Sequence, residues 1–169
     1  MKQFFILLFM AAAFMSCSDE SELRPDCAEA RYDLKLSGNT MNTFDVYYTY
    51  LSYDGTEEVL PSSSRHSLGV HCTSFPCTFL GEMRIAPKAD ATGNELSYSI
   101  TMKVQSLKVR KGTEIDGGYE VLKQDGYSEV VEVKDIRDLQ AFADSFNLAS
   151  VRHTYVVSAD GNIKQLKAN

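Results

Sequence analysis

The sequence predicts a mainly β fold, an antiparallel sandwich or barrel of about ten short strands with one late helix. After residue 28, apolar and polar residues alternate with a period of two along most of the chain. Turn signals such as Asp54-Gly55 interrupt this alternation at short intervals. Helical spacing of apolar residues marks one segment, 135–147. These patterns favour two packed sheets, or one closed sheet, over a helical bundle.

The clearest strand begins at Leu96 and alternates strictly as far as Val104. Past Gln105 the apolar positions change parity, which predicts a β-bulge or a crossing between sheets. Hairpin turns are expected at 54–55, in the KQDG segment and in the ADGN segment. Other strands are expected at 30–36, 44–53, 56–60, 66–72, 77–86, 119–122, 127–133 and 151–157, with a short last one around Ile163.

The late helix carries an apolar stripe formed by Ile136, Leu139, Phe142, Ala143 and Phe146. Asp135 is expected to cap its N-terminus, and Asn147 to end it. The SGNT segment, 37–40, is expected to be a turn. A C-terminal hairpin is expected after the helix.

The N-terminus has the pattern of a secretory signal. Residues 4–15 are apolar, which suits a signal's hydrophobic region of ~7–15 residues but not a membrane span of ~20. The stretch Phe14-Met15-Ser16-Cys17 resembles the lipobox of bacterial lipoproteins, with Phe14 where that family usually has Leu. The resemblance implies that a signal peptide, 1–16, is removed and that Cys17 carries lipid chains. The alternative is an ordinary secreted protein.

Acidic residues follow Cys17, and 17–27 is expected to be a flexible tether before a single β-rich domain, 28–169. This stretch resembles the surface-export signal of Bacteroidetes lipoproteins, which implies attachment to the outer membrane and exposure on the cell surface. The formal net charge of −6 argues against nucleic acid as a partner.

Three features resemble the immunoglobulin-like sandwiches of small envelope proteins of the MmpS type. They are the DVYYTYLSYDGT hairpin (45–56), the SFPCTF segment (74–79) and the long alternating strand. The likeness covers about half of the chain and implies an immunoglobulin-like β-sandwich. A lipocalin-like barrel is the alternative, since a late helix followed by a strand also suits it. The chain has no Trp, however, and so lacks the Gly-x-Trp signature of lipocalins.

The cysteines predict a disulfide, because exported proteins meet oxidising conditions. In a straight strand the Cα atoms of Cys72 and Cys77 would lie ~16 Å apart, whereas a bridge needs ~4.4–6.8 Å. A Cys72–Cys77 bridge therefore requires the chain to turn back at 74–76, and Cys27 is the alternative partner of either residue. A metal site with His66 and His71 is disfavoured, because the spacing matches neither a zinc ribbon nor a finger.

An aromatic run offers a surface for stacking on glycans or for contacting a protein: Tyr47, Tyr48, Tyr50 and Tyr53. The competing interpretation is ordinary strand propensity, with tyrosines alternating between core and surface.

Oxygen ligands for calcium occur in two acidic loops, which match no EF-hand and are expected to be solvated turns. They contain Asp90, Asn94 and Glu95, and Glu114 and Asp116. No nucleophile elbow, phosphate loop, dinucleotide fingerprint or paired-histidine zinc helix occurs. His71 and Cys72 are strand neighbours that point to opposite faces, and His153 in its strand is expected to be structural. The sequence therefore predicts no enzyme, no cofactor and no metal.

The functional expectation is a lipid-anchored, non-catalytic binding or assembly module of the cell envelope, with a glycan or a protein as ligand. The alternative is a periplasm-facing, lipocalin-like carrier of a small apolar ligand. Its cavity would be lined by Tyr98, Ile100 and Met102.

Overall fold

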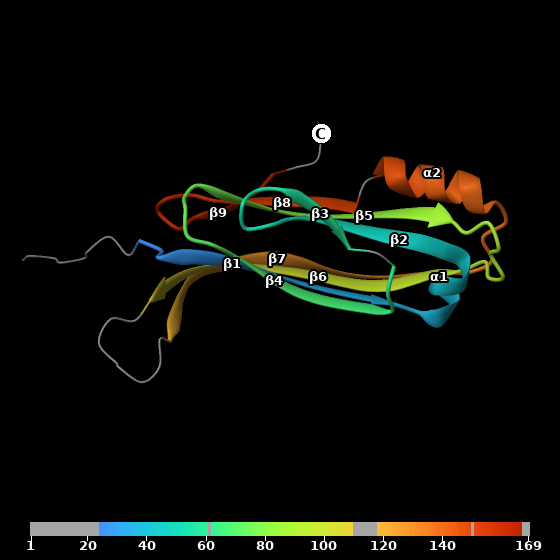
Figure 1. The fold of residues 1–169 in the computed structure, drawn as a ribbon, viewed down its shortest axis with the longest axis horizontal. Coiled ribbons are helices and arrows are strands. Elements are labelled where there is room, and N and C mark those ends of the chain that lie inside the picture. The colour runs from blue at the N-terminus through green and yellow to red at the C-terminus, as the bar shows by residue number, and fades with distance from the viewer. Residues whose placement is uncertain (1–23, 61, 110–117, 150, 167–169) are drawn as a thin grey trace, which may run out of the picture.

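The computed structural model describes residues 24–60, 62–109, 118–149 and 151–166. They form two antiparallel sheets packed face to face, with the two helices at one end (Figure 1). Cys17, the signal segment and the loop residues Glu114 and Asp116 lie outside the described residues.

The first sheet has the strand order β4-β1-β6-β7, with β1 (Cys27–Leu36), β4 (Arg65–Cys72), β6 (Leu96–Val109) and β7 (Tyr119–Val133). The second has the order β3-β2-β5-β8-β9, with β2 (Phe44–Leu51), β3 (Glu57–Leu60), β5 (Cys77–Pro87), β8 (Val151–Val157) and β9 (Ile163–Leu166). The helices are α1 (Gly38–Thr43) and α2 (Leu139–Ala149).

The two sheets remain separate, because each ends in outer strands that pair on one side only among the described residues. The predicted antiparallel sandwich is therefore confirmed, and the alternative of a closed lipocalin-like barrel is wrong. The chain crosses between sheets at β1–β2, β3–β4, β4–β5, β5–β6 and β7–β8. This order differs from the ABED and CFG sheets of immunoglobulin domains, so the finer immunoglobulin-like connectivity is not confirmed.

The core between the sheets is filled by alternate strand residues. The positions expected to line a carrier's cavity, Tyr98, Ile100 and Met102, are 3%, 0% and 1% exposed and belong to this core. Side chains from both sheets pack there, with the rings of Tyr32 and Tyr48 in edge contact at a centroid distance of 6.0 Å. The expected cavity at these residues is therefore wrong.

The long pair formed by β6 and β7 contains one confirmed prediction and one error. The register shifts between Ser106 and Leu107, which confirms the irregularity expected where parity changes. The KQDG segment is not a hairpin, since β7 continues through it for 15 residues and Gly126 pairs with Lys103. The Asp125 carboxylate accepts the Gly126 N–H at 2.7 Å, so this Asp-Gly pair adjusts a strand without reversing it.

Both helices begin at polar caps that were not expected from the sequence. The cap of α2 is Asp138, whose Oδ1 accepts the Ala141 N–H at 2.9 Å, while Asp135 has a positive φ of 58° before the helix. The segment expected to be a turn after Ser37 is the short helix α1, because Ser37 Oγ accepts the Thr40 N–H at 3.1 Å. The expected C-terminal hairpin is confirmed by the pairing of β8 with β9. None of the helices in the described ranges is long and apolar enough to cross a membrane.

Candidate functional site

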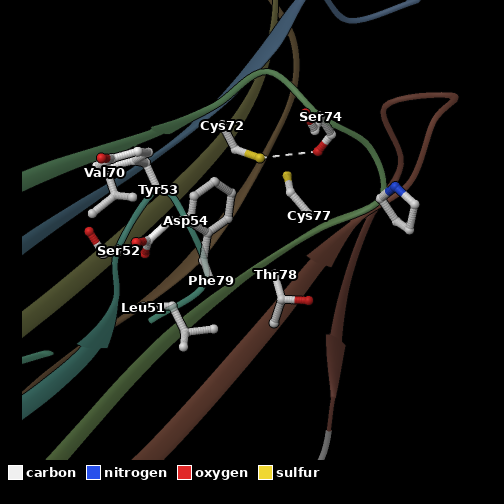
Figure 2. Close-up of a pocket in the computed structure, with 12 residues that line it drawn as sticks. Leu51, Ser52, Tyr53, Asp54, Val70, Cys72, Ser74, Cys77, Thr78 and Phe79 are labelled. Carbon is white, nitrogen blue, oxygen red and sulfur yellow. Dashed lines mark hydrogen bonds between the residues drawn. The ribbon is translucent and has the colours of Figure 1, made fainter. Parts of the chain in front are cut away.

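A pocket of about 470 Å³ opens between the β2–β3 hairpin and the β4–β5 connection (Figure 2). It brings together two groups that the sequence singled out separately, namely Tyr53 and the thiols of Cys72 and Cys77. The lining consists of Leu51, Ser52, Tyr53, Asp54, Gly55, Val70, Cys72, Ser74, Pro76, Cys77, Thr78 and Phe79. One wall is thus a tight hairpin, and the other joins the two sheets.

The hairpin wall is held by hydrogen bonds of its own. The Thr56 N–H donates to Asp54 Oδ1 at 2.9 Å, and the Ser52 N–H donates to the Thr56 carbonyl at 2.8 Å. Gly55 supplies the positive φ, 81°, that the predicted Asp-Gly turn requires. The hydrogen bonds from Thr56 lower the pKa of Asp54. The pocket therefore carries a fixed carboxylate beside the exposed ring of Tyr53.

The opposite wall places two thiols side by side. Cys72 ends β4 in one sheet and Cys77 begins β5 in the other, so the chain does turn back between them. The Cys72 thiol donates to the Ser74 carbonyl at 3.1 Å, and the two sulfurs face each other (Figure 2). Burial, the neighbouring Cys72 thiol and a hydrogen bond with it raise the pKa of Cys77 to about 12. Both residues are thiols in this structure.

Cys27 does not reach this site. Ala28 is the register partner of Cys72, and Ala28 and Cys72 both face the core. Cys27, as the neighbour of Ala28 in β1, points to the other face of the sheet. The alternative of a bridge from Cys27 to Cys72 or Cys77 is therefore wrong for this fold.

The four tyrosines of the aromatic run divide between core and surface. Tyr48 and Tyr50 are 1% and 6% exposed, so the expectation that they belong to a binding surface is wrong. Tyr47 and Tyr53 are 42% and 78% exposed. Strand alternation explains why Tyr47 is exposed while Tyr48 and Tyr50 are buried. Tyr53 lies beyond the end of β2, in the turn. A binding role can rest only on Tyr47 and Tyr53.

The metal-ligating residue types do not gather. His71 and Cys72 lie on opposite faces of β4, and His66 lies ~20 Å along the strand from Cys72 at ~3.3 Å per residue. The Glu95 carboxylate of the acidic loop accepts a hydrogen bond from Asn39 Nδ2 at 2.7 Å. Within the described residues, no group of three or more His, Cys, Asp or Glu side chains is placed to hold a metal ion.

The carboxylates of Glu29 and Glu82, which are buried, are also far from each other. Glu29 forms an ion pair with Arg31, and Glu82 forms one with Arg84 at 2.9 Å. Alternation in β1 and β5 directs each glutamate to the outer face of its own sheet. The whole sandwich separates them, so they cannot act as a general acid and base on one substrate.

His153 lies in β8, on the same face of the strand as the core residues Tyr155 and Val157. Its ring stacks on Tyr127 with a centroid distance of 3.4 Å, and its Nδ1 lies 3.1 Å from Gln165 Nε2. Burial lowers the pKa of His153, against a smaller opposing effect of the Glu129 carboxylate. The contacts match the structural role expected from the sequence.

We expect His153 to make the fold less stable as the pH falls. Its folded-state pKa lies below the ordinary ~6.5, so between the two values the unfolded chain binds more protons. The free energy of unfolding should therefore decrease as the pH falls through ~6.5 and level off below the folded-state pKa. Thermal melts across this range should show a smaller decrease for His153→Gln than for the exposed control His71→Gln. Equal decreases in both variants would contradict this assignment.

Sequence reasoning missed several pocket residues. The sequence does not predict that Val70, Ser74 and Phe79, from two expected strands and the segment between them, line one pocket. Their shared location depends on how the two sheets stack, which no local pattern encodes. No known protein family, curated protein or solved structure matches this chain. The pocket is therefore interpreted from its own chemistry.

Proposed function

We propose that this chain is a lipid-anchored, non-catalytic binding module of the cell envelope that takes a glycan into the pocket beside Tyr53. The observation that carries the proposal is the convergence of an exposed aromatic ring with polar groups at one concave site. Tyr53 offers a ring face for a sugar, while Ser52, Asp54 and Thr78 offer hydrogen-bonding groups. The volume of about 470 Å³ falls within the ~300–1,000 Å³ of small-molecule sites.

The position of the pocket suits an anchored protein. β1 begins at Cys27, beside the end of β4, so the chain enters the sandwich at the end where the pocket opens (Figure 1). Cys17 precedes Cys27 by 10 residues (27 − 17), which extend to at most ~35 Å. A lipid on Cys17 would keep Cys27, and with it this end of the sandwich, within about that distance of the membrane. The proposed ligand is a glycan close to the outer membrane, on the cell-surface side, because the acidic stretch after Cys17 resembles a surface-export signal.

In this proposal the sandwich is the rigid scaffold that holds the pocket residues in place. Immunoglobulin-like domains likewise carry their binding loops at the ends of the sheets. The hairpin after β2 and the β4–β5 connection lie at one such end. The alternative function, a lipocalin-like carrier, loses support because Tyr98, Ile100 and Met102 belong to the packed core where its cavity was expected.

Removing the exposed ring from the pocket should weaken glycan binding. We expect Tyr53→Ala to lower affinity by up to about tenfold for oligosaccharides released from the outer membrane of the native host, because one aromatic contact contributes ~0.5–1.5 kcal/mol. Tyr47→Ala is the matched control, since Tyr47 is also exposed but does not line the pocket. Calorimetric titration measures both. Undetectable binding of every oligosaccharide fraction, or equal affinity in both variants, would reject the glycan.

The lipid anchor is tested in the native host. Labelled palmitate should be incorporated into the wild-type protein and not into Cys17→Ser, because the thiol of Cys17 is the acceptor that the lipobox resemblance implies. Protease added to intact cells should digest the wild-type domain if it lies on the surface. Palmitate on both proteins would refute Cys17 as the lipid acceptor, and protection until lysis would place the domain in the periplasm.

A further inference from the structure

We propose that Cys72 and Cys77 form an intramolecular disulfide, made by exchange with a disulfide-bearing oxidant that enters through the pocket and reacts first at Cys72. This inference does not depend on glycan binding. It assigns a covalent modification to the wall of the pocket, and an order in which its two sulfurs react.

The position of the two thiols supports the bond. Their sulfurs face each other between β4 and β5 (Figure 2), and the Cys72 thiol is near enough to help raise the pKa of Cys77. The bond would join the two sheets, since Cys72 belongs to one and Cys77 to the other. Cys27 cannot compete, because it points to the opposite face of its sheet.

The order of reaction follows from exposure. Cys72 is half-buried at the pocket wall, whereas Cys77 is 6% exposed and belongs to the core. The raised pKa of Cys77 keeps its thiol protonated, so it is the poorer first nucleophile. An incoming disulfide therefore meets Cys72 first, and Cys77 can act only once a sulfur beside it has become electrophilic.

The exchange balances in two steps. The Cys72 thiolate, formed by loss of its proton to solvent, attacks a disulfide R–S–S–R and expels one RS⁻, leaving a mixed disulfide on Cys72. The Cys77 sulfur then loses its proton, attacks Cys72 Sγ and expels the second RS⁻. The two cysteines are oxidised by two electrons in total, and the external disulfide is reduced to two thiols.

Oxidised glutathione is the probe for the bond itself. The purified protein is incubated with it, its free thiols are alkylated, and the tryptic peptide 66–84, which contains Cys72 and Cys77 only among the cysteines, is weighed. We expect this peptide to be two hydrogens lighter and unalkylated until a reductant is added. The bridged protein should also melt about 5 °C higher than the reduced one. Alkylation of both thiols after exposure to oxidised glutathione would overturn the proposal.

The order of reaction is tested by trapping. In Cys77→Ser the mixed disulfide has no partner to resolve it, so one glutathione should accumulate on Cys72. In the matched variant Cys72→Ser, Cys77 should remain unmodified while the protein stays folded by circular dichroism. Faster modification of Cys77 than of Cys72 would overturn the order. If either variant fails to fold, the initial alkylation rates of the two thiols in the reduced wild-type protein decide the same question, with Cys72 expected to react faster.

Discussion

Alanine in place of Gly126 is expected to lower the free energy of unfolding by about 4 kcal/mol, a large share of a typical ~5–15 kcal/mol. The added Cβ would lie 2.1 Å from the Met102 carbonyl oxygen and 3.0 Å from Lys103 Cα. Both are backbone atoms of β6, so no side chain can turn aside to make room. The φ of 151° at Gly126 is also one that residues with a side chain rarely adopt.

Gly38→Ala is the matched control for this substitution. Gly38 lies in α1, an added Cβ there meets nothing within 4 Å, and alanine favours helices. Urea denaturation should place Gly38→Ala within ~0.5 kcal/mol of the wild type. If Gly126→Ala unfolds at the same urea concentration as Gly38→Ala, then β7 does not approach β6 as closely at this point as the structure has it.

The error at KQDG shows what a local pattern cannot decide. The Asp-Gly pair at 54–55 forms a hairpin turn, whereas the same pair at 125–126 lies inside a strand. Glycine permits both outcomes, so its neighbours in space decide. Beside Gly126, β6 offers a continuous partner along the whole of β7, and pairing with it satisfies more backbone groups than a turn would. Most strands were predicted near their observed positions, because alternation reports directly on burial.

The candidate site was predictable in its parts but not in its assembly. Alternation alone separates Tyr47 from Tyr48, and a proline-containing connection makes a Cys72–Cys77 approach feasible. That Cys27 cannot bridge to Cys72 or Cys77 becomes clear only from the register of β1 against β4. The meeting of Tyr53 with the thiols needed the stacking of one sheet on the other. Such contacts depend on distances between distant segments, which single-sequence patterns do not contain.

Removing the side-chain amide of Asn147 is expected to cost about 3 kcal/mol of stability. β8 pairs with β5 only between Cys77 and Met83, and beyond that point α2 takes the place of the strand. There Asn147 Nδ2 donates to the Ile85 carbonyl at 2.9 Å, and the Ile85 N–H donates to Asn147 Oδ1 at 3.0 Å. Asn147→Ala leaves a donor and an acceptor of a buried residue unpaired, at ~1–3 kcal/mol each.

Two further variants separate this role from loss of helix propensity. Gln140 carries the same amide on the same helix, but bonds only the exposed Asp144 carboxylate, so Gln140→Ala should cost less than ~0.5 kcal/mol. Asn147→Asp keeps the acceptor for the Ile85 N–H but turns a second carboxylate oxygen toward the Ile85 carbonyl in place of the donor, so it should be at least as destabilising as Asn147→Ala. Equal stability of Asn147→Ala and Gln140→Ala in urea denaturation would contradict the pairing. The prediction that the helix ends at Asn147 is therefore wrong, since α2 continues to Ala149. The Asn147 side chain instead extends the hydrogen bonding of the sheet beyond the end of β8.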